Sequence, residues 1–368
     1  MRFTCTQQSL NRALGIVLRA VSSRTTIPIL KGILFRVEGD TLTLSSSNLD
    51  LSIETKIKVQ DSEDGAYVIG AKLISEIVRR LPNAMITMSS DERDNLRLVC
   101  LGSEFLIVTM PAEEYPSIGF TDGGKRCKVS IKALADLVQK TSFAASVDEK
   151  KGILTGCLVR FYGSYMEMAA IDGFRMAIAN TEADSGITGD IVIPAGILND
   201  ISRLIQEADG AEEVDIKIDE KRVEFSFEET RITARQLEGA FMAYRDILPK
   251  EYKTRFIINR EELLSSIERA SLFAKEGKNN LIKINVSGGM INISSRSEEG
   301  NVSESISAEV EGDDMLIGFN SKYISDVLKA VTDEDVAFEM TGRESSCLIK
   351  PADGEKYIYL VLPVRMTA

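Results

Sequence analysis

The segment VIGAKLISEIV at Val68–Val78 returns twice, as VIPAGILNDIS at Val192–Ser202 and as GFNSKYISDVL at Gly318–Leu328. The spacings between the copies are nearly equal, 192 − 68 = 124 and 318 − 192 = 126 residues. Each copy starts with strand-like residues and continues with apolar residues at helical spacing. The copies share an acid at one position: Glu76, Asp200 and Asp326. We therefore interpret the chain as three repeats of one unit.

A second amphipathic segment opens each repeat. Its apolar positions are Leu10, Leu14 and Val17, then Leu134, Leu137 and Val138, then Leu263, Leu264 and Ile267. Runs of β-type residues fill the remainder, so each repeat reads β-α-β-β-β-(β)-α-β-β-β. Two helices against many antiparallel strands predict an α+β layer. We expect three domains, 1–121, 122–250 and 251–368, with linkers at Ser117–Arg126 and Leu248–Lys253.

Composition favours a globular protein of the cytoplasm. The 368 residues are 44% hydrophobic and 27% charged, which is usual for a soluble chain. No apolar run approaches the ~18 residues of a membrane span, and strand-like sequence starts directly after Met1, so we expect no signal peptide. The five cysteines are scattered and odd in number, which predicts reduced, buried thiols. The net charge of −12 argues at first sight against a nucleic-acid partner.

The chemistry of common enzymes is absent from the sequence. The chain has no histidine, so serine, threonine and cysteine nucleophiles lack their usual base. The stretch Gly119–Arg126 approaches a phosphate-binding loop, but Arg126 stands where the hydroxyl residue is needed. We expect a binding protein with no catalytic residues, no cofactor and no metal. A hydrolase or transferase on repeated α+β domains, and a monomeric peptide-binding scaffold, remain as alternatives.

The end of the chain is an apolar strand followed by a short tail. Tyr357–Leu362 is an unbroken β-type run, and Pro363 cannot donate to a sheet ladder, so the strand should stop there or lie on an edge. Val364, Arg365 and Met366 follow. An apolar tail of a soluble chain must lie on something, although a frayed end is the simpler alternative.

Cations occur steadily on the predicted helices and on the loops after them, despite the acidic total. A mildly basic helical face would hold DNA loosely through phosphates, without reading bases; routine surface charge is the alternative. The candidate DNA-facing residues are Arg19, Arg24, Lys72, Arg79, Arg80, Lys140, Lys150, Lys151, Arg203, Lys275 and Lys278.

Together these segments resemble one family over the whole length, the bacterial sliding clamp, which is the β subunit of DNA polymerase III. The resemblance rests on MRFT at Met1–Thr4, TIPIL at Thr26–Leu30, IDGFR at Ile171–Arg175, YRDILP at Tyr244–Pro249, Phe319, Asn320 and Tyr323, and LPVRM at Leu362–Met366. It implies a head-to-tail homodimer of three-domain chains that closes a six-domain ring. Helices would line the hole, and double-stranded DNA would be held by enclosure, which removes the objection from net charge.

The resemblance also implies a pocket between the second and third domains for short peptides of the replicative polymerase, the clamp loader and repair proteins. Aliphatic and methionine side chains would accept Leu or Phe anchors and repack around different partners, while Arg175 and Arg365 would orient polar groups of the peptide. By matching positions, the pocket comprises Leu154, Ile171, Gly173, Arg175, Met176, Met242, Ile247, Asn320, Tyr323, Ser346, Val361, Leu362, Pro363, Val364, Arg365 and Met366.

Four positions in or beside this pocket depart from the family pattern: Ile171, Phe174, Met242 and Asp246 stand where Thr, His, Pro and a basic residue are common. We therefore expect a more apolar pocket with a less basic rim. Asp172-Gly173 also fits a hairpin turn, and both interpretations can hold.

The implied dimer joins an edge of the first domain to an edge of the third. By resemblance, Phe105 and Ile107 would face Leu272 and Phe273, and acids would meet basic residues across the joint: Glu298, Glu299 and Glu304. The alternative is that Leu272 and Phe273 are only the buried end of a helix.

Overall fold

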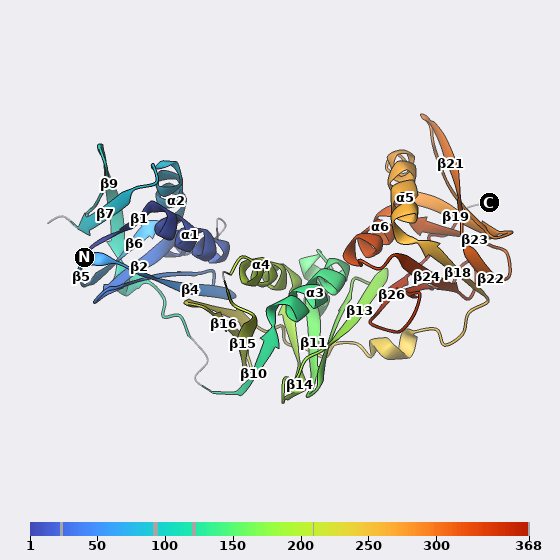
Figure 1. The fold of residues 1–368 in the computed structure, drawn as a ribbon, viewed down its shortest axis with the longest axis horizontal. Helices are drawn as coiled ribbons and strands as arrows, with labels where there is room; N and C mark the ends of the chain where they lie inside the picture. The colour runs from blue at the N-terminus through green and yellow to red at the C-terminus, as the bar shows by residue number, and fades with distance from the viewer. Residues whose placement is uncertain (23–24, 91–94, 120–122, 209, 367–368) are drawn as a thin grey trace. The chain divides into compact units, whose positions relative to one another are not determined.

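The computed structural model describes residues 1–22, 25–90, 95–119, 123–208 and 210–366 (Figure 1). One order of elements occurs three times, a strand and a helix, then a set of strands, then a second helix and three strands. This confirms the repeat that the sequence predicts.

The first repeat contains the following described elements: β1 (Arg2–Thr6), α1 (Gln7–Val17), β2 (Gly32–Glu38), β3 (Thr41–Ser47), β4 (Leu51–Lys58), β5 (Gln60–Glu63), β6 (Gly65–Gly70), α2 (Ala71–Arg80), β7 (Met85–Ser90), β8 (Asn95–Cys100) and β9 (Ser103–Pro111). The second contains β10 (Lys125–Ser130), α3 (Ile131–Thr141), β11 (Gly156–Tyr162), β12 (Tyr165–Ile171), β13 (Arg175–Glu182), β14 (Thr188–Pro194), α4 (Ala195–Gln206), β15 (Glu213–Ile218), β16 (Arg222–Phe227) and β17 (Thr230–Arg235).

The third repeat contains β18 (Thr254–Asn259), α5 (Arg260–Ala274), β19 (Leu281–Ser287), β20 (Met290–Ser297), β21 (Gly300–Ser307), β22 (Glu309–Gly312), β23 (Met315–Asn320), α6 (Ser321–Ala330), β24 (Asp335–Met340), β25 (Cys347–Pro351) and β26 (Tyr357–Val361). Short 3-10 turns lie between these elements, among them η6 (Tyr244–Ile247) after the second repeat. The predicted linker Ser117–Arg126 ran too far, because Lys125 and Arg126 already belong to β10.

Polar side chains start several helices directly at the end of a strand. Thr6 accepts a hydrogen bond from the Ser9 amide at 3.2 Å, and Asn259 accepts from the amides of Glu261 and Glu262, both at 3.1 Å. The Asn320 side chain accepts from the Lys322 amide at 3.0 Å. These caps satisfy amides that the first helical turn leaves free, typically stabilising a helix by about 1 kcal/mol.

The chain forms two compact units that cut across the repeats, residues 1–131 with 200–236 and residues 132–199 with 237–368. The first unit contains a 13-stranded sheet in the order β10-β15-β16-β17-β4-β3-β2-β6-β9-β8-β7-β1-β5. The second contains a nine-stranded sheet, β14-β11-β12-β13-β26-β25-β24-β18-β22, and a four-stranded sheet, β21-β20-β19-β23. Strand pairs β17–β4 and β13–β26 therefore join successive repeats into continuous sheets.

The helices bury one apolar face each. In α1, Leu10, Leu14 and Val17 are buried, and the helix packs on β3 and β4. In α2 the buried positions are Ala71, Ile74 and Val78, whereas Leu73 is exposed. No described helix is long and apolar enough to cross a membrane.

Candidate functional site

The tail after β26 is fixed to the protein at two backbone positions. The Leu362 amide donates to the Phe174 carbonyl at 2.9 Å, and the Val364 amide donates to the Gly318 carbonyl at 2.8 Å. β26 itself is an interior strand between β13 and β25, and it ends at Val361, two residues before Pro363. The described part of the tail is thus seated on β23 rather than frayed.

The predicted hairpin turn exists and forms one side of the same region. β12 and β13 pair up to Ile171 and Met176, and Gly173 has a φ of 93°, which favours glycine. The Asp172 carboxylate accepts from the amides of Phe174 at 2.8 Å and Arg175 at 3.0 Å. This local network fixes the loop between the strands.

Arg175 is the most connected residue of the site. Its side chain is 7% exposed, and its guanidinium donates to Asp172 at 3.0 Å, to Asp326 of α6 at 2.6 Å and to the Phe143 carbonyl at 2.6 Å. The guanidinium carbon also lies 4.6 Å from the Tyr323 ring centroid and 5.3 Å from that of Phe143.

These partners give Arg175 a structural role. Its donors are directed at acceptors of the chain itself, so it ties the second repeat to the third. Arg365, in the tail, is exposed to solvent.

The predicted pocket residues divide by burial. Ile171, Met176 and Val361 are buried, and Leu154 packs against the same apolar cluster as Ile171 and Met176. The exposed or half-buried ones are Gly173, Met242, Ile247, Asn320, Tyr323, Ser346, Leu362, Pro363, Val364, Arg365 and Met366. The first group forms the floor of the surface, and the second group is accessible.

Phe174 belongs to this surface and was not among the predicted pocket residues. Its ring is more than half exposed and stacks on Tyr323, with 6.4 Å between centroids and 26° between planes. Its departure from the family pattern beside the predicted pocket was the signal available in the sequence.

A buried carboxylate fixes the connector that carries Met242 and Ile247. Glu167 on β12 is 1% exposed and accepts from the Tyr244 hydroxyl and the Arg245 guanidinium. Burial, followed by the hydrogen bond to Glu167, raises the pKa of Tyr244 above its usual value. The connector is therefore anchored at η6, directly between the two apolar side chains.

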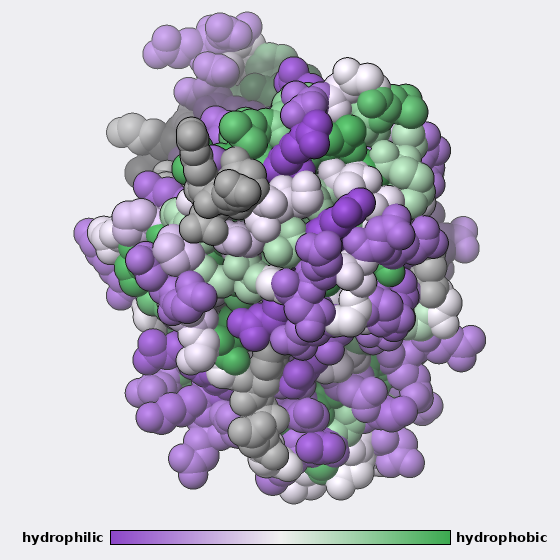
Figure 2. Space-filling view, turned by 90° about the vertical axis from the view of Figure 1, so that its left-hand side faces the viewer, coloured by the Kyte–Doolittle hydropathy of each residue, from purple (hydrophilic) through white to green (hydrophobic). Residues whose placement is uncertain are grey.

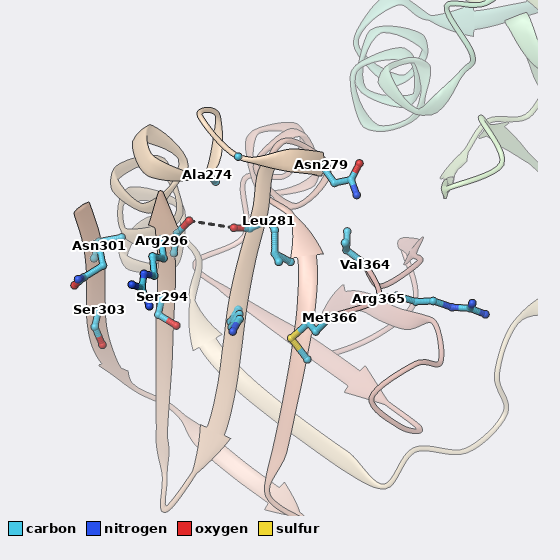
Figure 3. A pocket seen from close by; sticks show the side chains of 14 residues that line it. Ala274, Asn279, Leu281, Ser294, Arg296, Asn301, Ser303, Val364, Arg365 and Met366 are labelled. Atoms are coloured by element: carbon cyan, nitrogen blue, oxygen red, sulfur yellow. Dashed lines mark hydrogen bonds between the residues drawn. The ribbon is translucent and has the colours of Figure 1, made fainter. Parts of the chain in front are cut away.

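A separate cavity of about 640 Å³ lies between the end of α5, the sheet β19–β20–β21 and the tail (Figure 3). Val364 and Met366 lie beside Leu281, whereas Arg365 is directed away from them (Figure 3). The cavity mixes serine and asparagine side chains with Lys283 and Arg296.

The predicted DNA-facing cations divide into paired and unpaired groups. Arg19 pairs with Asp200 at 3.2 Å and Glu207 at 3.6 Å. Other cations with partners are Arg79 and Arg80, both on Glu76, Lys140 on Asp136, and Lys151 on the Asp172 carbonyl. Of the predicted DNA-facing cations that the structure describes, four are exposed and have no ion-pair partner: Lys72, Lys150, Arg203 and Lys275. Arg24 and the side chain of Lys278 lie outside the described residues.

Two of the three recurring acids bind an arginine of the preceding repeat. Asp200 binds Arg19 of the first repeat, and Asp326 binds Arg175 of the second. Glu76 has no preceding repeat in the chain, and its described partners are Arg79 and Arg80 of its own helix.

Among the open strand edges of the described sheets, those of β9 and β21 carry predicted interface residues. The Ser103–Val108 half of β9 pairs with β8, and only its far end, Thr109–Pro111, pairs with β6. β21 pairs with β20 and has no second neighbour among the described strands. Unpaired edges are templates for pairing with another chain.

Side chains alternate between core and surface along β9, and the predicted interface residue Ile107 lies on the core side. Ile107 is 3% exposed and belongs to the core, whereas its neighbours Leu106 and Val108 are 66% and 80% exposed. Seen from the side on which β9 lies, the surface is mostly hydrophilic and its hydrophobic side chains gather toward the top (Figure 2).

The other predicted interface residues are at least partly accessible to solvent. On α5, Leu272 is 64% exposed and Phe273 is half-buried, as is Phe105 on β9. Glu298 and Glu299 are exposed, but Glu304 already pairs with Arg269 of its own chain. That hydrogen bond holds the pKa of Glu304 below its usual range.

The cysteines are poor candidates for nucleophiles. All five are buried and unpaired, and burial raises the pKa of the Cys5 and Cys157 thiols to about 12. Among the described residues, no group of three or more acids and thiols is arranged to hold a metal ion.

Three family models match successive parts of the chain: the N-terminal domain of the DNA polymerase III beta subunit at residues 1–119, the central domain at 128–242 and the C-terminal domain at 245–365. The beta sliding clamp of Bacillus subtilis (strain 168) is 33% identical over 379 residues, which cover 99% of this chain and 100% of the relative. That of Synechocystis is 31% identical over 390 residues and is covered completely, as is this chain.

Solved structures agree. The sliding clamp of Bacillus subtilis superimposes with a TM-score of 0.94 at 32% identity, with both chains fully covered. A sliding clamp of Pseudomonas aeruginosa bound to griselimycin gives 0.93 at 27% identity, also with full coverage. A three-repeat α+β architecture with this match over its whole length defines a clamp-type protein. The chain belongs to the bacterial sliding-clamp family, the DNA polymerase III beta subunits.

Proposed function

We propose that two copies of this chain close head to tail into a ring around duplex DNA in the cytoplasm and act as the non-catalytic processivity subunit of the replicative polymerase. Family membership is the single observation that carries this proposal. The domains of the ring are taken as 1–121, 122–250 and 251–368. Enclosure explains how a chain with a net charge of −12 keeps DNA without a large cationic patch.

The open edges of β9 and β21 support the closure. In a head-to-tail dimer, β9 of one copy meets β21 of the other, and Leu106, Val108 and Leu272 leave solvent. Both joints of a two-fold ring are identical, so one pair of edges closes the whole assembly. In that arrangement Glu76 faces the third repeat of the partner, which completes the pattern of Asp200 and Asp326.

The test of enclosure compares circular with linear DNA. The dimer is loaded by a clamp loader onto nicked circular DNA, and the complex is isolated by gel filtration. We expect retention on the circle and loss after one restriction cut, because the ring slides off free ends. Equal behaviour of both DNAs would overturn the proposal.

DNA contact itself should be weak and dependent on salt. The four unpaired cations Lys72, Lys150, Arg203 and Lys275 are proposed to face phosphates, while the paired ones contribute less. Each phosphate contact adds roughly 0.9 to the slope of log affinity against log salt.

We further propose that the surface formed by the tail, the Asp172–Phe174 loop and the η6 connector docks short peptides of polymerase subunits, clamp loader and repair proteins. The accessible side chains there are largely apolar: Phe174, Met242, Ile247, Leu362, Val364 and Met366. Flexible methionines suit a surface that accommodates several partners.

Removing residues 364–368 should abolish this docking and leave the dimer intact. The deletion takes away Val364 and Met366 but no residue of β26 and none of the open edges. A fluorescein-labelled synthetic peptide with Leu and Phe anchors reports binding by anisotropy, and light scattering reports the dimer. Unchanged peptide affinity, or loss of folding in a thermal melt, would contradict the assignment of the tail.

A further inference from the structure

The tail rests on a glycine, Gly318, which is buried in β23. The Val364 amide donates to its carbonyl at 2.8 Å. A Cβ atom at this position would lie 3.0 Å from Cγ of Met366 and 3.1 Å from the Val364 carbonyl oxygen. It would also lie 2.9 Å from Cδ1 of Leu281, the end of a flexible side chain. Met366 therefore occupies the space that a side chain at position 318 would need.

The other two repeats have opposite sizes at the equivalent positions. Val68 and Val192 occupy the place of Gly318 in the repeated segment, as the strand registers Gly32↔Gly70, Gly156↔Pro194 and Leu281↔Asn320 confirm. On the neighbouring strand, the first two repeats have Gly32 and Gly156, against which the valines pack closely, whereas the third has Leu281. In the third repeat alone, the small residue lies on the strand before the second helix and the large residue lies on the neighbouring strand.

The segment that leaves the last strand follows the same path in the second and third repeats. The Leu237 amide donates to the Val192 carbonyl at 2.8 Å, as the Val364 amide does to Gly318. Two residues further lies Gly239 in the second repeat and Met366 in the third. The second repeat thus combines a valine on the strand with a glycine on the exit segment, and the third combines a glycine with a methionine.

We infer that Gly318 is a positioning residue of the docking surface, because its bare backbone seats Met366 and so holds the tail in place. The inference rests on the proposed docking function and extends it to a residue behind the surface. In the third repeat, the Val364 hydrogen bond and the close approach of Met366 to Gly318 hold the segment on β23, so its position depends on this seat.

The test is Gly318→Val in the full-length protein, which restores the residue of the other repeats. Methyl-¹³C methionine NMR, with Met366 assigned through Met366→Leu, reports the tail without any peptide. We expect the Met366 methyl signal to move to the position of a solvent-exposed methionine. Affinity for the labelled peptide with Leu and Phe anchors should fall about tenfold or more.

Two further variants separate seating from folding. Leu281→Gly/Gly318→Val recreates the pairing of the first two repeats, so it removes crowding with Leu281 while Met366 stays displaced. Gly196→Val is the matched control, since a Cβ at Gly196 meets nothing within 4 Å. Folding is followed by thermal melting.

If the Met366 methyl signal does not move in folded Gly318→Val protein, the inference that Gly318 positions Met366 is wrong. If the signal moves and peptide affinity stays the same, the seat is correct but its link to docking is overturned. If the unmodified protein binds no peptide, the docking function fails, and the methyl signal still decides the seat.

Discussion

Replacing Leu106 with aspartate is expected to convert the dimer into folded monomers. Leu106 is 66% exposed in the chain, so the substitution removes little from the core. In the proposed ring the same position lies at the joint with β21 of the partner. An unpaired carboxylate buried in an apolar contact costs at least about 2 kcal/mol, and the ring contains the substitution twice.

Light scattering provides the measurement. The variant should run near 40.5 kDa, whereas the unmodified protein should run near twice that mass. Retention on circular DNA should disappear with the dimer. Val147→Asp is the control, because Val147 is fully exposed and lies in the second repeat, which supplies neither β9 nor β21.

A compensating change tests the joint itself. Leu106→Asp combined with Leu272→Lys places opposite charges on the two sides of both joints and should recover part of the dimer. A dimer that persists in Leu106→Asp at low micromolar concentration would show that β9 is not at the joint.

The second large effect is expected from Arg175→Met. The arginine is buried and pairs with Asp172 and Asp326, and methionine would leave both carboxylates without their cation. Breaking a buried pair of this kind typically costs about 3–5 kcal/mol. Tyr323 would also lose the cation that lies over its ring, so the docking surface should loosen together with the fold.

Denaturant titration of Arg175→Met against Arg365→Met separates the two arginines. Arg365 is exposed, so its variant should unfold like the unmodified protein and affect only peptide affinity. A double-mutant cycle with Asp326→Asn should give a coupling of about 0.5–3 kcal/mol. Unchanged stability of Arg175→Met would mean that the ion-pair network does not join the repeats energetically.

Much of the fold follows from local patterns. The repeated segment at Val68–Val78 encodes a strand end and a helix start, and the structure places both there in every repeat. Pro363 ends the last strand because proline has no amide to donate. Such features depend on neighbours a few residues away, so the order of helices and strands can be read from the sequence.

In a continuous apolar strand, the sequence alone does not show which side chains face the core and which face solvent. Phe105–Val108 has no polar residue to mark the outer face, and the prediction chose Ile107 where the structure exposes Leu106 and Val108. The face is set by packing against the rest of the first repeat. A shift of one residue reverses every side chain of a strand.

The sequence by itself determined the threefold repeat, the α+β class and the segments that form the candidate site. Only the tertiary structure decided what those segments do to one another. Arg175 meets Asp326 from 151 residues away, and Gly318 seats Met366 because large and small residues exchange places between paired strands. Contacts of this kind arise from the packing of distant strands and helices, and no local spacing encodes them.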